Sequence, residues 1–168
     1  MNVAAKLQSE LTETFSGAAL RNSGFAGIGV DLASVARIKL AIERSGEAFV
    51  ERVYLSDEIA YCRAAEYAYE RFAALWAVRE AAVKALGTGY ADGVGFHDIE
   101  IICREGAAPR LRFRGRFAEI AASRNIHDSR VTLSHDRDNV VAVVVLFQKI
   151  ISGALDEGVA EVELNRSR

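Results

Sequence analysis

The chain has 168 residues, 51% of them hydrophobic and 26% charged, and its formal net charge is −2 at pH 7. This length and balance predict a globular domain with its own core and exclude a strongly basic binder of nucleic acid. Its two cysteines lack the spacing of a metal site, its N-terminus does not resemble a signal sequence, and it has no apolar run of about 18 residues, so we expect a cytoplasmic protein that does not span a membrane.

The first residues predict a separate arm followed by the start of a domain. Apolar residues recur at roughly helical spacing in the arm, residues 1–24: Val3, Leu7, Leu11 and Phe15. The stretch FAGIGVDL at 25–32 is short, apolar and interrupted by glycine, which favours a buried strand. Ser34 is a suitable N-cap for a following helix, and Gly46 is a suitable end for it.

The middle of the chain predicts two more helices. Ser56 is the expected cap of the first, which is short. The second is long, because residues 66–86 keep a helical pattern until Gly87 and Gly89.

The second half of the chain predicts four strands and one helix. Segments 98–103 and 110–113 favour a hairpin, because a glycine and the only proline lie between them. Residues 116–124 have a helical pattern. Segments 130–136 and 140–147 have the alternation or the β-branched content of strands, and the last strand is expected to be central.

Together these elements predict an α+β fold, in which a mostly antiparallel sheet packs against the long helix. The folded domain is expected at 25–149. Residues 150–168 are acidic and then basic without a clear period, so we interpret them as a weakly ordered C-terminal extension.

Two carboxylates are candidates for chemistry. Asp31 ends an apolar strand, where an uncompensated charge is costly to desolvate, although an aspartate there could also cap the next helix. Glu80 lies on the edge of the buried stripe of the long helix, although it could simply pair with Lys84 one turn later. The residues alone leave both alternatives open.

Arg79 raises a different question, because it falls near the centre of the apolar stripe of the long helix. That stripe is formed by Phe72, Leu75, Trp76, Val83 and Leu86. A buried guanidinium needs an acceptor, which could be a protein carboxylate, a partner subunit or a bound phosphate. Our hypothesis is a phosphate.

The loop Gly87-Thr88-Gly89 and His135 are weaker candidates. Gly87 is explained by a helix C-cap, and a helix C-terminus offers carbonyls instead of phosphate-binding N–H groups. His135 lies at a strand end, from which its ring could face a cleft. Its neighbours Ser134 and Asp136 do not form a catalytic triad with it, because adjacent strand residues alternate faces.

Arg37 and Arg44 are seven residues apart on the first predicted helix of the domain and therefore share a face. Such a face suits an acidic protein partner, although solvated charge is the simpler interpretation.

Four motifs in chain order resemble the holo-acyl-carrier-protein synthases, the small 4′-phosphopantetheinyl transferases. They are GIGVDL at 27–32, WAVREAAVKALGTG at 76–89, DIEI at 98–101 and VTLSHD at 131–136. The resemblance spans about residues 25–147. It implies transfer of 4′-phosphopantetheine from coenzyme A to a serine of an acyl carrier protein, with Mg²⁺ and release of adenosine 3′,5′-bisphosphate.

The resemblance also implies roles for individual residues. Asp31 and Glu80 would hold the metal, with Glu80 or a water that it orients as a proton acceptor, and Lys84 and His135 would complete the catalytic set. The expected coenzyme A contacts are Arg79, Lys84, Gly87, Thr88, Gly89 and His135. Arg37 and Arg44 would bind the acidic carrier protein, and the small members of the family are usually homotrimers with active sites between subunits.

Three positions depart from the family pattern. Arg79 stands where a lysine is usual, Leu75 where an arginine is common, and Ser34 where a glutamate is common. The first two keep open an alternative function, a non-catalytic homologue that binds coenzyme A or carrier protein or serves as an assembly subunit.

Overall fold

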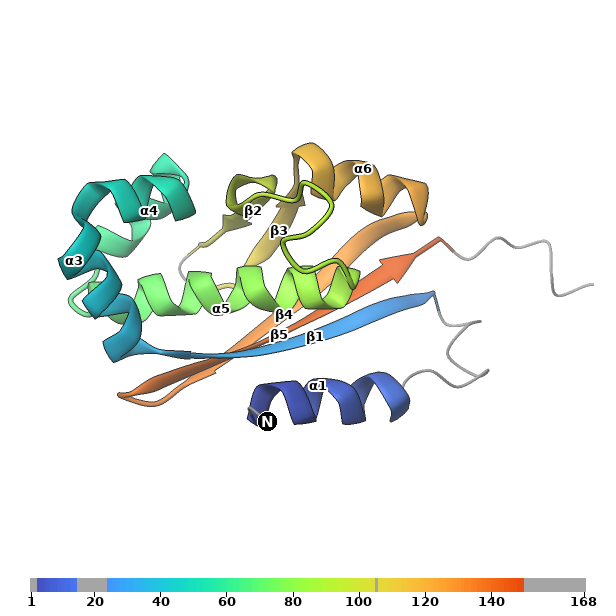
Figure 1. Cartoon of the computed structure of the whole chain (residues 1–168), viewed down its shortest axis with the longest axis horizontal. Helices are drawn as coiled ribbons and strands as arrows, with labels where there is room; N and C mark the ends of the chain where they lie inside the picture. Colours follow the sequence, from blue (N-terminus) through green and yellow to red (C-terminus); the bar gives the residue numbers. More distant parts are fainter. Residues whose placement is uncertain (1–2, 15–23, 105, 150–168) are drawn as a thin grey trace, which may run out of the picture.

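A three-stranded antiparallel sheet carries the long helix α5 (Ala68–Leu86) on one face (Figure 1). The computed structural model describes residues 3–14, 24–104 and 106–149. The strands are β1 (Phe25–Ser34), β4 (Ile126–His135) and β5 (Asn139–Gln148), and their order is β1-β5-β4. The last strand is therefore central, as predicted, and β1 is an edge strand.

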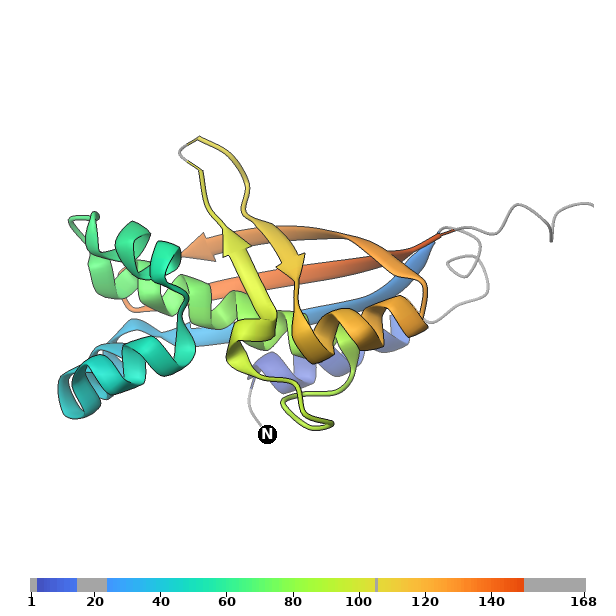
Figure 2. The same ribbon diagram turned by 90° about the horizontal axis from the view of Figure 1, so that it is seen from above.

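The remaining elements surround this layer. They are α1 (Val3–Thr14), α3 (Val35–Val53), α4 (Ser56–Arg63), the 3-10 turn η1 (Phe96–Asp98), β2 (Ile99–Ile102), β3 (Arg110–Phe113) and α6 (Gly115–Ser123). Strands β2 and β3 pair as the predicted antiparallel hairpin. Seen from above, this hairpin, α4 and α6 lie on the α5 side of the sheet (Figure 2). The predicted α+β fold is confirmed.

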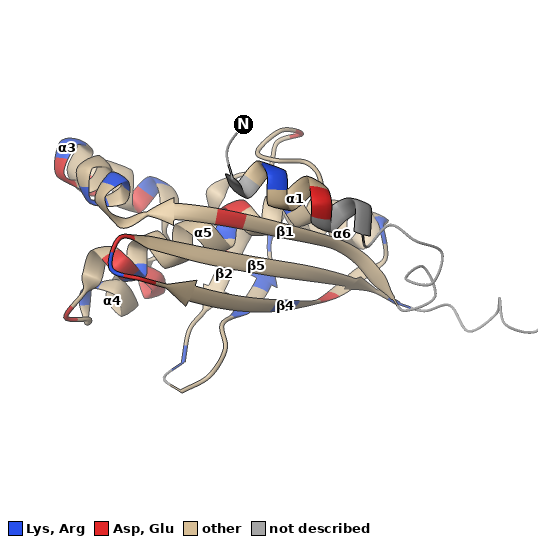
Figure 3. Cartoon of the chain, turned by 90° about the horizontal axis from the view of Figure 1, so that it is seen from below, with Lys and Arg blue, Asp and Glu red and all other residues tan. Residues whose placement is uncertain are grey.

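The two faces of the central strand differ sharply in burial. Alternate residues that face α5 are fully buried: Val140, Ala142, Val144 and Leu146. The residues between them are only partly covered, and the face they form carries few charges (Figure 3). One face is thus the core of the domain, and the other is an apolar surface.

Two glycines of β1 allow its backbone to approach α5 closely. A Cβ added at Gly29 would lie 1.8 Å from the Ala81 carbonyl oxygen, and one added at Gly27 would lie 2.2 Å from that of Ala85. No side chain larger than hydrogen fits at such distances. The GIGVDL segment therefore brings the part of β1 just before Asp31 into close contact with the helix.

Several predicted helix boundaries are confirmed, because the expected capping contacts are present. The Ser34 hydroxyl accepts a hydrogen bond from the Arg37 N–H, and Gly87 ends α5 in the left-handed conformation at φ 78°. Gly46 has the non-helical angles φ 57° and ψ −144° and divides α3 into two helical segments, so the expected end of a helix at Gly46 is confirmed. The sequence interpretation missed the second segment, which continues to Val53.

The predicted cap of α4 was wrong. Ser56 is the first helical residue, and Leu55 occupies the N-cap position. The N–H of Leu55 donates instead to Glu58 Oε2 at 2.8 Å, so a glutamate in the first turn satisfies the helix start.

The ends of the chain are only partly described. Part of the predicted arm is the helix α1, whereas the predicted C-terminal extension at 150–168 lies outside the described residues. Of the helices described in 3–14, 24–104 and 106–149, none has the length and hydropathy needed to cross a bilayer.

Candidate active site

Asp31 and Glu80 line one pocket of about 390 Å³ between β1, α3 and α5. Asp31 reaches it from within β1, which continues to Ser34, so the expectation that Asp31 ends the strand was wrong. Glu80 reaches the pocket from α5, six residues before the helix ends at Leu86. Arg37 lies on the same wall, and the stacked rings of Phe49 and Trp76, 6.1 Å apart, form the apolar side. The structure therefore brings the two predicted carboxylates together.

Lys84 neutralises Asp31. Its Nζ lies 2.7 Å from Asp31 Oδ1 and 3.1 Å from the Val30 carbonyl oxygen, so the ammonium bridges α5 and β1. The side chains of Lys84 and Asp31 are 30% and 12% exposed. The alternative in which Asp31 caps α3 does not hold, because Ser34 makes the capping contact.

Glu80 has no ion-pair partner within 4.0 Å among the described residues, and Lys84 pairs with Asp31 instead of with the glutamate one turn earlier. Burial raises the pKa of Glu80, and the negative charge of Asp31 raises it further, while Lys84 only partly offsets these effects. A carboxyl in this state is a better proton acceptor near neutral pH than an ordinary surface glutamate.

This donor set fits Mg²⁺. Magnesium prefers oxygen ligands and commonly takes one or two protein carboxylates, with water and substrate phosphates as its other ligands. Asp31 and Glu80 offer two such carboxylates in one pocket, and the repulsion between them is the kind that a divalent cation relieves. Within the described residues no group of three or more acidic, histidine or cysteine side chains is arranged to hold a metal.

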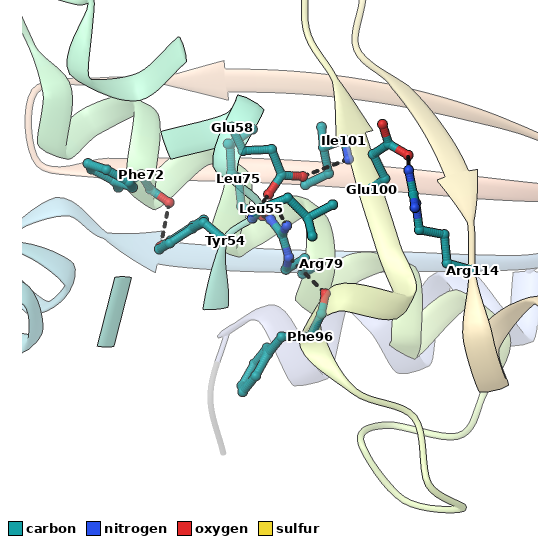
Figure 4. A network of polar contacts seen from close by, with 10 residues as sticks. All are labelled: Tyr54, Leu55, Glu58, Phe72, Leu75, Arg79, Phe96, Glu100, Ile101 and Arg114. Atoms are coloured by element: carbon teal, nitrogen blue, oxygen red, sulfur yellow. Dashed lines mark hydrogen bonds and ion pairs between the residues drawn. The ribbon is translucent and has the colours of Figure 1, made fainter. Parts of the chain in front are cut away.

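Arg79 requires a correction, because its acceptor is a protein carboxylate (Figure 4). Its side chain is completely buried, and its Nη2 donates to Glu58 Oε2. Nε donates to the Phe96 carbonyl at 3.2 Å and Nη1 to the Leu75 carbonyl at 3.4 Å. With its donors occupied by the protein, Arg79 has no accessible group for a phosphate, and the hypothesis of a coenzyme A contact was wrong.

Glu58 is the partner of Arg79, and the sequence interpretation missed it. Its Oε1 accepts the Ile101 N–H at 2.8 Å, while Oε2 accepts the Leu55 N–H and the Arg79 guanidinium. The residue therefore ties α4, α5 and β2 together (Figure 4). Its position in the first turn of a helix was a signal for capping, but nothing in the local sequence indicated a contact with a residue 21 positions later.

The loop after α5 has its amides already engaged. The N–H groups of Gly87, Thr88 and Gly89 all lie within hydrogen-bond distance of the Val83 carbonyl oxygen, and the Thr88 hydroxyl donates to the Gly89 carbonyl at 3.0 Å. These amides turn back toward the helix, as a C-cap requires. In this conformation any contact of the loop with a ligand comes from its other atoms.

His135 lies away from the two carboxylates. Its Nδ1 is 2.5 Å from Glu70 Oε1, at the other end of α5 from Glu80, and it lines a different pocket of about 490 Å³ with Tyr61, Arg71 and others. The two pockets share no residue. A single chain therefore does not bring His135 together with Asp31 and Glu80.

Arg37 and Arg44 are both exposed on α3. Arg37 also lines the carboxylate pocket, so the predicted partner-binding face borders the candidate site. Their side chains make no ion pair within 4.0 Å with another described residue, which leaves both charges available.

Tyr90 is a second residue that the sequence interpretation missed. Its hydroxyl is buried and has no hydrogen-bond partner in the described part of the chain. Burial raises its pKa, and the nearby charges of Glu80 and Asp31 add to the effect, so the group stays a neutral hydroxyl. No local sequence pattern indicated a role for Tyr90, because a tyrosine in the loop after a helix is common.

Comparisons with known proteins identify the family of the chain. Residues 27–144 match the 4′-phosphopantetheinyl transferase superfamily. The chain is 40% identical over 120 residues to a holo-[acyl-carrier-protein] synthase of Koribacter versatilis, which covers 71% of this chain and 96% of the relative. It is 44% identical over 119 residues to the corresponding synthase of Desulforudis audaxviator, and this match covers 71% of this chain and 90% of that relative.

Solved structures show the same relationship. The Helicobacter pylori holo-[acyl-carrier-protein] synthase in complex with coenzyme A superposes with a TM-score of 0.62 at 32% identity, over 71% of this chain and 98% of that one. The Neisseria meningitidis synthase superposes with a TM-score of 0.68 at 27% identity, over 74% of this chain and 99% of that one. The chain therefore belongs to the 4′-phosphopantetheinyl transferase superfamily. Within it, the identity over nearly the full length of these relatives makes it an enzyme of the holo-[acyl-carrier-protein] synthase group.

Proposed function

We propose that the chain transfers the 4′-phosphopantetheine group of coenzyme A to a serine of an apo-acyl carrier protein and releases adenosine 3′,5′-bisphosphate. The observation that carries this proposal is the shared pocket of Asp31 and Glu80 beside Lys84. In the reaction, the serine oxygen forms a bond to the phosphorus that bears the pantetheine, and the bond from that phosphorus to the bridging oxygen breaks. The bridging oxygen leaves with the nucleotide.

Glu80 is the proposed acceptor of the serine proton, either directly or through a water. Its raised pKa supports this role, because proton transfer is most efficient when the pKa of the base approaches the working pH. Lys84 is proposed to place its positive charge beside the pyrophosphate while it orients Asp31.

Asp31 and Glu80 are the proposed ligands of Mg²⁺. The ion would supply charge neutralisation on the pyrophosphate oxygens. The two residues would hold it with carboxylate oxygens from a strand and a helix, elements that the close contact of β1 with α5 keeps rigid.

His135 and the loop at 87–89 are proposed coenzyme A contacts. Because His135 lies in a separate pocket, it would reach the carboxylates of another subunit in an oligomer. The partly covered apolar face of the sheet supports a homotrimer as that oligomer, since such a face is stabilised by burial against other copies. Arg37 and Arg44 are the proposed contacts with the acidic carrier protein.

The function can be tested by mass spectrometry. Purified protein is incubated with coenzyme A, Mg²⁺ and a panel of apo-carrier proteins, and the proposal predicts that at least one carrier gains the mass of phosphopantetheine. Binding of coenzyme A without transfer to any carrier would instead identify the non-catalytic homologue. The ion pair of Arg79 with Glu58 argues against that alternative. Arg79 stands where the family usually has a lysine, and Glu58 compensates its charge inside the fold.

A further inference from the structure

The helix α1 lies outside the part of the chain that matches the superfamily, which begins at residue 27. It runs beside the edge strand β1, on the side of the sheet away from α5 (Figures 1 and 3). Among the described strands this edge of β1 has no partner, because their order in the sheet is β1-β5-β4. An unpaired edge exposes backbone donors and acceptors that need another partner.

Gln8 of α1 supplies that partner. Its Nε2 donates to the Ile28 carbonyl at 2.6 Å, and its Oε1 accepts from the Val30 N–H at 2.7 Å. A primary amide has one acceptor and donors in the same plane, as a peptide group does. The Gln8 side chain therefore pairs with β1 as one peptide unit of a neighbouring strand would.

The contact lies directly before the carboxylate site. The Val30 carbonyl accepts from Lys84 Nζ at 3.1 Å, and the same ammonium lies 2.7 Å from the carboxylate of Asp31. Val30 is thus held through its N–H by α1 and through its carbonyl by α5. On the other side of the strand, the contact at Gly29 leaves no room for movement toward α5.

We propose that Gln8 is a positioning residue for the transferase site, which acts by fixing the β1 backbone at Ile28 and Val30 and thereby the placement of Asp31 and Lys84. The rate effect rests on the proposed function, whereas the backbone contact does not. Loss of the Gln8 amide frees the outer edge of β1 and leaves the Val30 carbonyl contact with Lys84 as the polar contact that the described residues make on that edge at Val30. Small displacements of a positioning group cost large factors in rate.

The test uses the full-length protein with Gln8→Ala, the isosteric Gln8→Glu, and Lys6→Ala as a control. Alanine preserves the helix propensity of α1 and removes both contacts, whereas glutamate keeps the acceptor for the Val30 N–H and replaces the donor to Ile28 with a carboxylate oxygen. Lys6 lies on the same helix but pairs with Glu10 at the surface. Amide hydrogen exchange is measured at Val30 and at Val144 of β5, and kcat and KM for the carrier are measured in the transfer assay.

We expect the Val30 amide to exchange at least tenfold faster in Gln8→Ala while Val144 is unchanged, because the acceptor of the Val30 N–H is lost. Gln8→Glu keeps an oxygen acceptor for that N–H, so its Val30 amide should exchange more slowly than that of Gln8→Ala. We also expect kcat to fall by about threefold to thirtyfold with little change in KM, since the α3 face is untouched. Lys6→Ala should match the wild type in both measurements.

Two results would overturn the proposal in different ways. Unchanged exchange at Val30 in Gln8→Ala would show that Gln8 does not hold the strand in solution. Faster exchange with an unchanged kcat would show that Gln8 docks the arm without positioning the site. An inactive wild type would refute the proposed function, and with it the rate effect, while the exchange data would still decide whether the contact exists.

Discussion

Two salt bridges join helix α5 to its neighbours, and they differ in burial and in what surrounds them. The side chains of Arg79 and Glu58 are 0% and 2% exposed. All three guanidinium nitrogens of Arg79 and both carboxylate oxygens of Glu58 have hydrogen-bond partners in the protein. The side chains of Lys84 and Asp31 are 30% and 12% exposed, and Asp31 lines a pocket. The second carboxylate of that pocket, Glu80, has no ion-pair partner among the described residues. The hydrogen bonds of the first pair are complete within the protein, whereas the second pair lies beside the unpaired carboxylate of Glu80.

This difference separates a structural role from a chemical one. A buried pair whose hydrogen bonds are all made has nothing left to offer a ligand, and breaking it leaves an uncompensated charge in the core. Where the partly exposed pair lies beside Glu80, two carboxylates face one ammonium, and the pKa of Glu80 is raised. An excess of negative charge and a raised pKa are features of sites that bind cations and transfer protons. Both pairs lie on one helix, so the same element serves as a core support and as a wall of the site.

The largest expected effect sharpens the comparison on its structural side. Glu58→Ala leaves the Arg79 guanidinium buried without its carboxylate and should lower the free energy of unfolding by about 3–5 kcal/mol. Chemical denaturation checks this value. Glu119→Ala removes an exposed pair with Arg116 and serves as the control, for which a change within about 0.5 kcal/mol is expected. Equal losses in the two variants would contradict the structural role.

The next effect sharpens the chemical side. Asp31→Ala should lower the transfer rate by about a hundredfold or more, because a charge-stabilising ligand is lost at the reacting group. The free energy of unfolding should change far less than in Glu58→Ala, since Asp31 borders a pocket. Asp138→Ala in the exposed turn between β4 and β5 is the control. A wild-type rate in Asp31→Ala would remove Asp31 from the site.

A smaller effect concerns recognition at the border of the pocket. Arg44→Glu should raise KM for an acidic carrier about tenfold and leave kcat nearly unchanged, because a rim charge steers and holds the partner without reaching the reacting atoms. Lys39→Glu makes the same charge change on the same helix but on another face, where the lysine pairs with Glu43. If both variants behave alike, net charge and not the Arg37–Arg44 face governs binding.

The smallest effect is one of stability. The pKa of Glu80 is raised in the folded protein, so the folded state loses stability as the pH rises through that pKa. Glu80→Gln removes this penalty and should raise Tm by a few degrees at pH 7, with the gain vanishing below about pH 4, near the pKa of an ordinary glutamate. Thermal unfolding measured across this pH range checks the prediction, and Glu43→Gln on the surface of α3 should show no such trend.

Local signals in the sequence predicted the elements and the two site carboxylates well. Glycine at 27 and 29 before Asp31, the Ser34 cap and the Gly87 stop are all short-range features, and each has a direct physical consequence in the structure. The shared pocket of Asp31 and Glu80 followed from motif order, because the family resemblance linked two segments that no local rule connects.

Long-range pairings were the part that could not be predicted. The partner of Arg79 depended on α4 folding back over α5, and several acceptors were equally consistent with a buried guanidinium in the sequence. The hydrogen bonds of Gln8 with β1 depend on where the arm docks, which no periodicity encodes. The separation of His135 from Asp31 depends on which side of α5 each strand occupies.

The most direct test measures the transfer rate and the free energy of unfolding side by side for two isosteric variants, Glu58→Gln and Asp31→Asn. Each replaces one carboxylate of the two α5 salt bridges with a neutral amide of the same size. We predict that Asp31→Asn loses the transfer rate and keeps its stability, whereas Glu58→Gln loses stability and keeps most of the rate under conditions in which it is folded. The opposite pattern, or equal loss of both properties in the two variants, would contradict the assignment of one pair to structure and the other to chemistry.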